Sequence, residues 1–169
     1  MHPFQAQVFT AIEKRNDGML TAPTGSGKTL ALALPYLIQY QQRNTKGEGI
    51  ELIWISPLRS LSQDLCDAIR KAAKILQIDC TVNVRNGDTP QKERERQKRQ
   101  APNILITTPE TLHLFFAQKK NDRYLNKVKM IVVDEWHELL GSKRGVQTEL
   151  ALSQLRHYNP NALVWGISA

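Results

Sequence analysis

A glycine-rich segment near the start of the chain has the residue types that hold a polyphosphate. It lies between a short apolar stretch and a helical one and reads Ala22-Pro23-Thr24-Gly25-Ser26-Gly27-Lys28-Thr29. Glycines let backbone N–H groups curl around phosphate oxygens, and the positive end of a following helix favours the same anion. We therefore predict a nucleotide-phosphate site over 24–29, with the Lys28 ammonium on the β- and γ-phosphates and the Thr29 hydroxyl on Mg²⁺. The alternative is a simple turn between strand and helix, which the order of glycines, lysine and threonine disfavours.

Two adjacent carboxylates follow an apolar run later in the chain, in Met130-Ile131-Val132-Val133-Asp134-Glu135. If this run is a strand of a parallel sheet, its carboxyl end lies at the same edge as the phosphate site. We predict that Asp134 holds Mg²⁺ through water and that Glu135 accepts the proton of the water that attacks the γ-phosphate. An acidic pair at a strand end is also typical of a solvated turn or a helix cap, but the phosphate site favours the catalytic interpretation.

The elements that would position these residues alternate along the chain. Short apolar stretches predict strands, and longer stretches between them, with apolar residues at helical spacing, predict helices. Several strands are apolar on both faces, as in a parallel sheet covered by helices. We therefore expect one α/β domain over 1–169, a doubly wound, mostly parallel sheet with helices on both faces. The predicted strands are Met19–Thr21, Glu51–Ser56, Cys80–Val84, Asn103–Thr107, Lys129–Asp134 and Ala162–Ser168; the predicted helices include Leu30–Arg43, Leu58–Leu76 and Gly145–Tyr158; and Asn44–Gly49 and Gln118–Lys127 are predicted polar loops.

Composition narrows the function classes. The 23 Lys and Arg residues against 16 Asp and Glu give a net charge of +7, which favours a polyanionic partner such as nucleic acid, although many ordinary domains are as basic. Cys66 and Cys80 have neither a CxxC nor a Cys/His spacing, so we interpret them as two buried thiols. The apolar runs are far shorter than the about 20 residues of a membrane span. No signal peptide is visible, which favours a cytoplasmic protein without a membrane partner.

The carboxylate segment Asp134-Glu135-Trp136-His137 reads D-E-x-H, and with the phosphate loop the chain resembles superfamily 2 helicases of the DEAD/DEAH (DExH-box) type. Ala22 stands where the strict P-loop pattern has glycine, which agrees with the A-x-T-G-x-G-K-T form of these helicases. The resemblance implies a RecA-like P-loop NTPase lobe that binds ATP and Mg²⁺. Further segments are similar to family motifs in the same order: Pro3-Phe4-Gln5 to the Q motif, in which Gln5 would recognise adenine, Ser56–Leu61 to motif Ia, Arg85–Thr89 to motif Ib, Thr107–Leu112 to motif Ic and Gly166–Ala169 to motif III.

The stretch Asp134–Leu152, D-E-W-H-E-L-L-G-S-K-R-G-V-Q-T-E-L-A-L, is most similar to the large helicase-related (Lhr) group and its ligase-associated DEXH-box DNA helicases. This likeness implies ATP-driven 3′-to-5′ movement on single-stranded DNA in DNA repair, with RNA as the alternative polymer. In the family, the histidine at the position of His137 links the nucleotide site to motif III, here Ser168. The family also has a second RecA-like lobe and an aromatic residue upstream of the Q motif. Neither lies in this sequence, so we expect a single lobe cut at both ends.

Residues at the ends of predicted strands are candidates for holding the phosphodiester chain, through short polar side chains and N–H groups that do not read bases. They are Arg59, Thr108, Glu110 and Thr111, together with Gly87, which the resemblance alone singles out. Arg59 could instead be a surface cation at a helix start, and Thr108 could be a helix cap with Glu110 in the acidic first turn. Capping and phosphate binding are compatible at one helix start, because its free N–H groups favour anions.

Other polar and aromatic positions have weaker signals. The mixed run Gln91–Gln100 predicts a solvated helix with ion pairs rather than a DNA contact. Lys143 and Arg144 follow the carboxylates closely, and contact with DNA and contact with the second lobe both stay open. Trp136 could stack on a base, but we favour packing for it, as for His113, because aromatic rings dominate cores.

The combined motifs predict an ATP-dependent helicase or translocase in which Lys28, Asp134, Glu135 and His137 are catalytic. A small-molecule kinase would need an acceptor pocket or a lid in place of the nucleic-acid motifs, and nothing in the sequence resembles one. Because the arginine finger is expected on the second lobe, the isolated lobe could also be a nucleotide- and nucleic-acid-binding module with negligible turnover.

Overall fold

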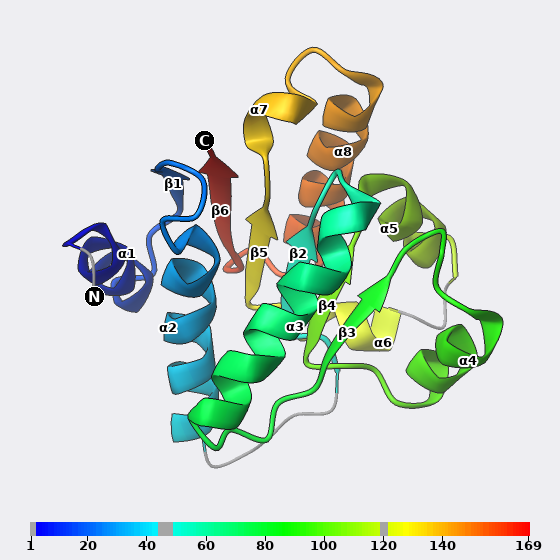
Figure 1. Ribbon diagram of the computed structural model, residues 1–169. Helices are drawn as coiled ribbons and strands as arrows, with labels where there is room; N and C mark the ends of the chain where they lie inside the picture. Colours follow the sequence, from blue (N-terminus) through cyan, green and yellow to red (C-terminus); the bar gives the residue numbers. More distant parts are fainter. Residues whose placement is uncertain (1–2, 44–48, 119–121) are drawn as a thin grey trace.

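The computed structural model describes residues 3–43, 49–118 and 122–169. Within these residues, six strands form one sheet in the order β1-β6-β5-β2-β4-β3, and every pairing is parallel (Figure 1). Each strand extends at most one residue beyond its predicted stretch. The strands are β1 (Gly18–Thr21), β2 (Leu52–Ile55), β3 (Val82–Arg85), β4 (Ile104–Thr107), β5 (Met130–Val133) and β6 (Leu163–Ser168).

Helices cover both faces of the sheet (Figure 1). Side chains of α1, α2 and α3 form the core on one face, and those of α5, α6 and α8 form it on the other, which confirms the predicted α/β fold. No helix in the described ranges is long and apolar enough to cross a bilayer. The helices are α1 (Pro3–Glu13), α2 (Lys28–Gln42), α3 (Arg59–Ile75), α4 (Gln91–Arg99), α5 (Pro109–Phe116), α6 (Asp122–Leu125), α7 (Trp136–Leu139) and α8 (Lys143–Tyr158).

Successive residues of the central strands point to opposite faces of the sheet. In β2, Trp54 joins the core under α2 and α3, whereas Ile53 and Ile55 join the core under α5 and α8. The strands β2, β4 and β5 are buried at every position, which explains why their sequences are continuous apolar runs. The parallel register brings the carboxyl ends of all the strands to one edge, so the loops that follow β1, β2, β4 and β5 share that edge.

Some predictions about loops and thiols need correction. The stretch 118–127, predicted as a polar loop, contains the short helix α6, because Tyr124 and Leu125 bury their side chains in the core. The other predicted loop, Asn44–Gly49, lies almost entirely outside the described residues. Cys66 is buried as expected, but Cys80 is only partly buried.

The charged run Gln91–Gln100 forms the helix α4 and confirms the prediction of a solvated helix. Its surface has two ion pairs, Arg96 with Glu93 and Lys98 with Glu95, both at 2.8 Å; in each pair the two residues are three positions apart along the helix. Such exposed pairs contribute little to stability.

Candidate nucleotide and nucleic-acid site

The predicted phosphate loop connects β1 to α2 at the carboxyl edge of the sheet. Gly25 (φ 74°) and Gly27 (φ 87°) have left-handed backbone, which L side chains rarely adopt, and Gly27 is the N-cap residue of α2. A Cβ atom at Gly25 would meet nothing within 4 Å. The backbone conformation, rather than crowding, therefore requires glycine at this position, and the loop is open there.

Polar side chains of the loop supply donors that suit a triphosphate. Lys28 Nζ donates a hydrogen bond across the loop to the carbonyl oxygen of Ala22. Ser26 Oγ is buried and has no hydrogen-bond partner among the described residues, and a buried polar group of this kind calls for a ligand or water to satisfy it. Thr24 is exposed, and Thr29 is half-buried in the first turn of α2. These residues fit the phosphate group of a nucleotide.

Gln5 lies beside the phosphate loop, although it belongs to α1. Its Nε2 donates to the carbonyl oxygen of Gly27 at 3.4 Å, and a Cβ atom at Gly27 would lie 3.0 Å from the same nitrogen. The packing of α1 on the same core as α2 brings the two segments together. The structure thus places Gln5 near the nucleotide site, and its contact with adenine stays a prediction.

Asp134 directly follows β5, and both of its carboxylate oxygens accept hydrogen bonds. Trp54 Nε1 donates to Oδ2 at 3.3 Å, and the backbone N–H of Glu135 donates to Oδ1 at 3.0 Å. Burial raises the pKa of Asp134 above its ordinary value, whereas these hydrogen bonds and the charge of Lys28 act in the opposite direction. Lys28 and Asp134 both follow strands of one parallel sheet, so they lie at the same edge of that sheet.

Glu135 has an unusual backbone conformation at the start of α7, with φ 48° and ψ 47°. Left-handed backbone costs a non-glycine residue about 1–3 kcal/mol and is concentrated at functional sites. The turn brings Glu135 Oε2 to 3.5 Å from His137 Nδ1. The same nitrogen lies 3.0 Å from Ser168 Oγ at the end of β6. The predicted base, link and coupling residues are therefore in contact with one another.

Arg59 and Gly87, which belong to two different predicted nucleic-acid motifs, lie against each other. Arg59 Nη1 is 3.3 Å from Asp88 Oδ1. A Cβ atom at Gly87 would come within 2.7 Å of Arg59 Cζ. A side chain at position 87 would therefore displace the guanidinium, so the glycine leaves the room that Arg59 occupies.

Thr108 is the N-cap residue of α5, as the sequence predicted. Its Oγ1 accepts a hydrogen bond from the backbone N–H of Thr111 at 3.4 Å and lies 3.1 Å from Thr111 Oγ1. Glu110, in the first turn of the same helix, forms an ion pair with Arg144 at 2.6 Å. The predicted contacts of these residues with a phosphodiester chain stay predictions, and the cap leaves the helix start compatible with an anion.

Comparison with known families agrees with this geometry. The family model described as DEAD/DEAH box helicase matches residues 2–169. The chain belongs to the DEAD/DEAH box helicase family. The phosphate loop after β1, the acidic pair after β5 and the polar ends of the neighbouring strands are therefore parts of a helicase domain of this family.

Relatives of this helicase domain include several Lhr helicases. The ATP-dependent helicase Lhr-Core of Methanothermobacter thermautotrophicus is 36% identical over 98% of this chain and 20% of the relative. The Lhr helicase/uracil glycosylase of Escherichia coli is 33% identical over 89% of this chain and 11% of the relative. The structure of Mycobacterium smegmatis helicase Lhr bound to ssDNA and AMP-PNP has a TM-score of 0.82 at 34% identity, over 99% of this chain and 22% of that chain. The resemblance to the Lhr group is confirmed, and the helicase domain spans only a small part of each relative.

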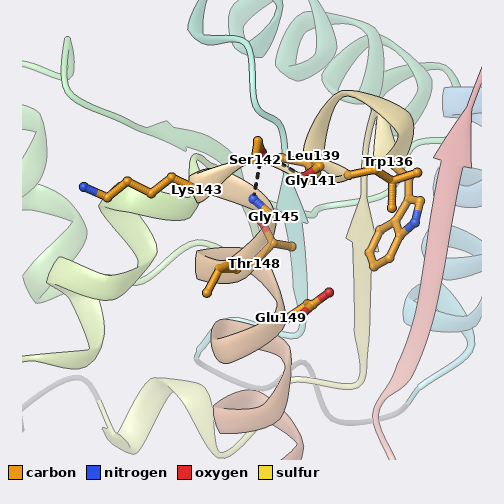
Figure 2. A pocket seen from close by; sticks show the side chains of 10 residues that line it. Trp136, Leu139, Gly141, Ser142, Lys143, Gly145, Thr148 and Glu149 are labelled. Atoms are coloured by element: carbon orange, nitrogen blue, oxygen red, sulfur yellow. Dashed lines mark hydrogen bonds between the residues drawn. The ribbon is translucent and has the colours of Figure 1, made fainter.

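The two aromatic side chains interpreted as packing residues are in packed positions. Trp136 is partly buried against the core under α5 and α8, and His113 Nε2 lies 2.7 Å from the carbonyl oxygen of Gln147. Trp136 also lines a cavity of about 340 Å³ between α7 and the start of α8. Figure 2 shows Trp136 and Lys143 on opposite sides of this cavity, with Lys143 pointing away from the tryptophan.

Two contacts of the helicase domain had no clear signal in the sequence. Trp54 donates to Asp134 from the neighbouring strand β2, at a separation of 80 residues. Arg144 contacts Pro57 and Glu110, which lie 87 and 34 residues away. A tryptophan in an otherwise aliphatic buried strand was the one available hint for the first contact, because a buried indole N–H needs an acceptor.

Proposed function

We propose that this chain is the ATP-binding lobe of an ATP-dependent helicase or translocase that acts on single-stranded DNA. The observation that carries the proposal is geometric: the phosphate loop with Lys28 follows β1, and the Asp134 carboxylate directly follows β5, at the same edge of one parallel sheet. A cation for phosphate and a carboxylate for metal at one edge of a parallel sheet are what nucleotide hydrolysis by a P-loop domain requires.

The phosphate loop would hold ATP through its backbone N–H groups, the Lys28 ammonium and the buried Ser26 hydroxyl. Thr29 and, through water, Asp134 would hold Mg²⁺, which neutralises charge on the β- and γ-phosphates when it is bound. Gln5 would contact the adenine, and its place beside the loop supports this role.

Glu135 would orient the attacking water and accept its proton, because its carboxylate follows the metal-binding one in the chain. His137 would connect this base to Ser168, which its Nδ1 approaches at 3.0 Å. Glu135→Gln should therefore keep ATP binding and abolish hydrolysis, since the amide can still accept hydrogen bonds but cannot take up a proton.

A second RecA-like lobe of the same protein would complete the site. An arginine finger is worth about 10³- to 10⁵-fold in rate in phosphoryl transfer, and the family resemblance places that arginine on the second lobe. The 169 residues alone should therefore bind nucleotide but turn it over slowly. The alternative for the isolated chain is therefore a module that binds nucleotide and nucleic acid with negligible turnover.

Single-stranded DNA is the polymer that we propose, because the similar Mycobacterium smegmatis helicase Lhr was solved with ssDNA and AMP-PNP. Arg59, Gly87 and the start of α5 with Thr108 and Thr111 would hold the phosphodiester chain. An RNA helicase lobe is the alternative. On the same resemblance we propose 3′-to-5′ movement and a role in DNA repair.

The test measures ATP hydrolysis by this chain alone and joined to a second lobe, with single-stranded DNA, with RNA and without polymer. We expect turnover that DNA stimulates only when both lobes are present. Equal turnover with and without the second lobe would refute the assignment of the arginine finger, and stronger stimulation by RNA would favour the RNA alternative.

Two further measurements address the base and the direction of movement. Calorimetry should find unchanged ATP affinity in Glu135→Gln, and full hydrolysis by that variant would remove Glu135 as the base. Strand displacement from duplexes with either a 3′ or a 5′ single-stranded tail should proceed only from the 3′ tail. Faster displacement from the 5′ tail would reverse the proposed direction.

A further inference from the structure

The guanidinium of Arg144 connects two segments that the proposed function assigns to nucleic acid. Its Nε donates to Glu110 Oε1 at 2.6 Å, and its Nη1 donates to the carbonyl oxygen of Pro57 at 3.1 Å. Pro57 lies just beyond β2, and Glu110 lies in the first turn of α5, just beyond β4. Since β2 and β4 are paired, Arg144 joins the ends of two neighbouring strands.

The backbone that carries Arg144 is fixed relative to the nucleotide carboxylates. Ser142 Oγ donates to the carbonyl oxygen of Leu139 at 2.7 Å and accepts from the backbone N–H of Gly145 at 3.1 Å (Figure 2). A Cβ atom at Gly145 would overlap the Leu139 carbonyl oxygen, so α8 starts in close contact with the end of α7. Because α7 directly follows Glu135 and its end contacts the start of α8, a short packed path joins Glu135 to the Arg144 backbone.

The charge of Glu110 needs compensation if a phosphate is to approach the same helix start. Burial tends to raise the pKa of Glu110, but hydrogen bonds from its own backbone and from Thr108 and the charge of Arg144 together hold it below its usual range. The carboxylate is therefore ionised at neutral pH and would repel a phosphodiester. Arg144, which is always protonated, neutralises it and holds it to one side.

We propose that Arg144 is a positioning residue that couples the nucleotide site to the nucleic-acid-binding edge, by holding the loop at Pro57 and the start of α5 in the arrangement that accepts a phosphodiester chain. The proposal rests on the proposed function. A change at Glu135 on nucleotide binding would pass through α7 and the Ser142 turn to the guanidinium, and from there to both segments.

The experiment measures coupling between two ligands on a protein that contains this lobe and a second RecA-like lobe. The dissociation constant for a fluorescent single-stranded DNA is determined by anisotropy with and without Mg²⁺ and AMP-PNP. The ratio of the two constants is the coupling factor, for which values of about 5- to 150-fold are usual. We expect Arg144→Ala to remove most of this factor while DNA still binds in the absence of nucleotide.

The matched control is Arg156→Ala. Arg156 lies on the same helix and also forms an exposed ion pair, with Asp17, and its side chain is 43% exposed compared with 47% for Arg144. We expect the control to keep the full coupling factor. Arg144→Lys serves as a second variant that folds if alanine does not. Its ammonium can neutralise Glu110 but lacks the fork that also reaches Pro57, so we expect intermediate coupling.

The salt dependence of DNA binding separates positioning from direct contact. Loss of one phosphate contact lowers the slope of log K against log salt by about 0.7 on single strands, and we expect no such change in Arg144→Ala. Retained coupling in both Arg144 variants, with or without a reduced slope, would overturn the proposal. Failure of the unmodified protein and the Arg156→Ala control to bind either ligand would instead contradict the proposed function.

Discussion

Replacing Trp54 with phenylalanine would test whether a buried indole orients the carboxylate that is proposed to bind the metal. Trp54 is 0% exposed in β2, and its Nε1 lies 3.3 Å from Asp134 Oδ2. Phenylalanine keeps an aromatic ring in the core but removes the N–H donor. Asp134 would then keep the hydrogen bond from the Glu135 backbone and lose the one that fixes its other oxygen.

The size of the effect follows from the charge of the acceptor. A hydrogen bond to a charged group contributes about 1.5–3 kcal/mol, and loss of a partner that orients a metal ligand costs about 10- to 100-fold in metal affinity. These ranges agree, because a tenfold change corresponds to about 1.4 kcal/mol. We therefore expect Trp54→Phe to weaken Mg²⁺-dependent ATP binding about 10- to 100-fold.

The assay is calorimetry of ATP binding with excess Mg²⁺ and with excess EDTA, and the ratio of the two affinities is the measured quantity. Trp165→Phe is the matched control, because Trp165 is also buried, at 4% exposed, and its Nε1 donates at 3.0 Å to the carbonyl oxygen of Asn16, a neutral acceptor. Both variants should lose stability, but only Trp54→Phe should lose the benefit of Mg²⁺. An unchanged ratio in Trp54→Phe, or an equal loss in Trp165→Phe, would refute the orienting role.

Three further predictions concern packing and burial. Gly145→Ala should lower the free energy of unfolding by about 1–3 kcal/mol in urea titrations, because the new methyl group overlaps the Leu139 carbonyl oxygen; an unchanged midpoint would contradict the close contact of α7 and α8. Burial raises the pKa of Cys66 to about 11. A thiol reagent at pH 8 should therefore modify the partly buried Cys80 first, as followed by mass spectrometry. Modification of Cys66 before Cys80 would contradict the burial of Cys66. Glu51 is 3% exposed and forms ion pairs with Arg43 and Lys129. Glu51→Ala should therefore lower the free energy of unfolding by about 1.5–3 kcal/mol. A loss below about 0.5 kcal/mol, which is usual for surface sites, would show that these two ion pairs contribute little.

The sequence predicted the strands, and the places of the phosphate loop and the acidic pair at the ends of two of them, because these signals are local. Strands buried on both faces have continuous apolar runs, and the phosphate loop has its chemistry in consecutive residues from Thr24 to Thr29. The acidic pair could be assigned because parallel strands end at a common edge, whatever their order.

Contacts between distant segments could not be predicted in the same way. Whether Trp54 lies beside Asp134 depends on β2 being the neighbour of β5, and strand order leaves no mark in the sequence. The short helix α6 has only four residues, which are too few for a periodic signal in the sequence, although Tyr124 and Leu125 are buried. The partners of Arg144 depend on three strand ends at once, which left its role open.

The position of β6 has a consequence for the order in which the protein forms as it is synthesised. β6 lies between β1 and β5, so the strand that comes last in chain order among the six separates the first strand from the rest of the sheet. β1, which leads into the phosphate loop, can therefore join the sheet only when residues 163–168 are available for pairing. Contacts between such distant segments are slow to form, so we expect the phosphate loop to reach its place at the edge of the sheet only after β6 has paired with both of its neighbours.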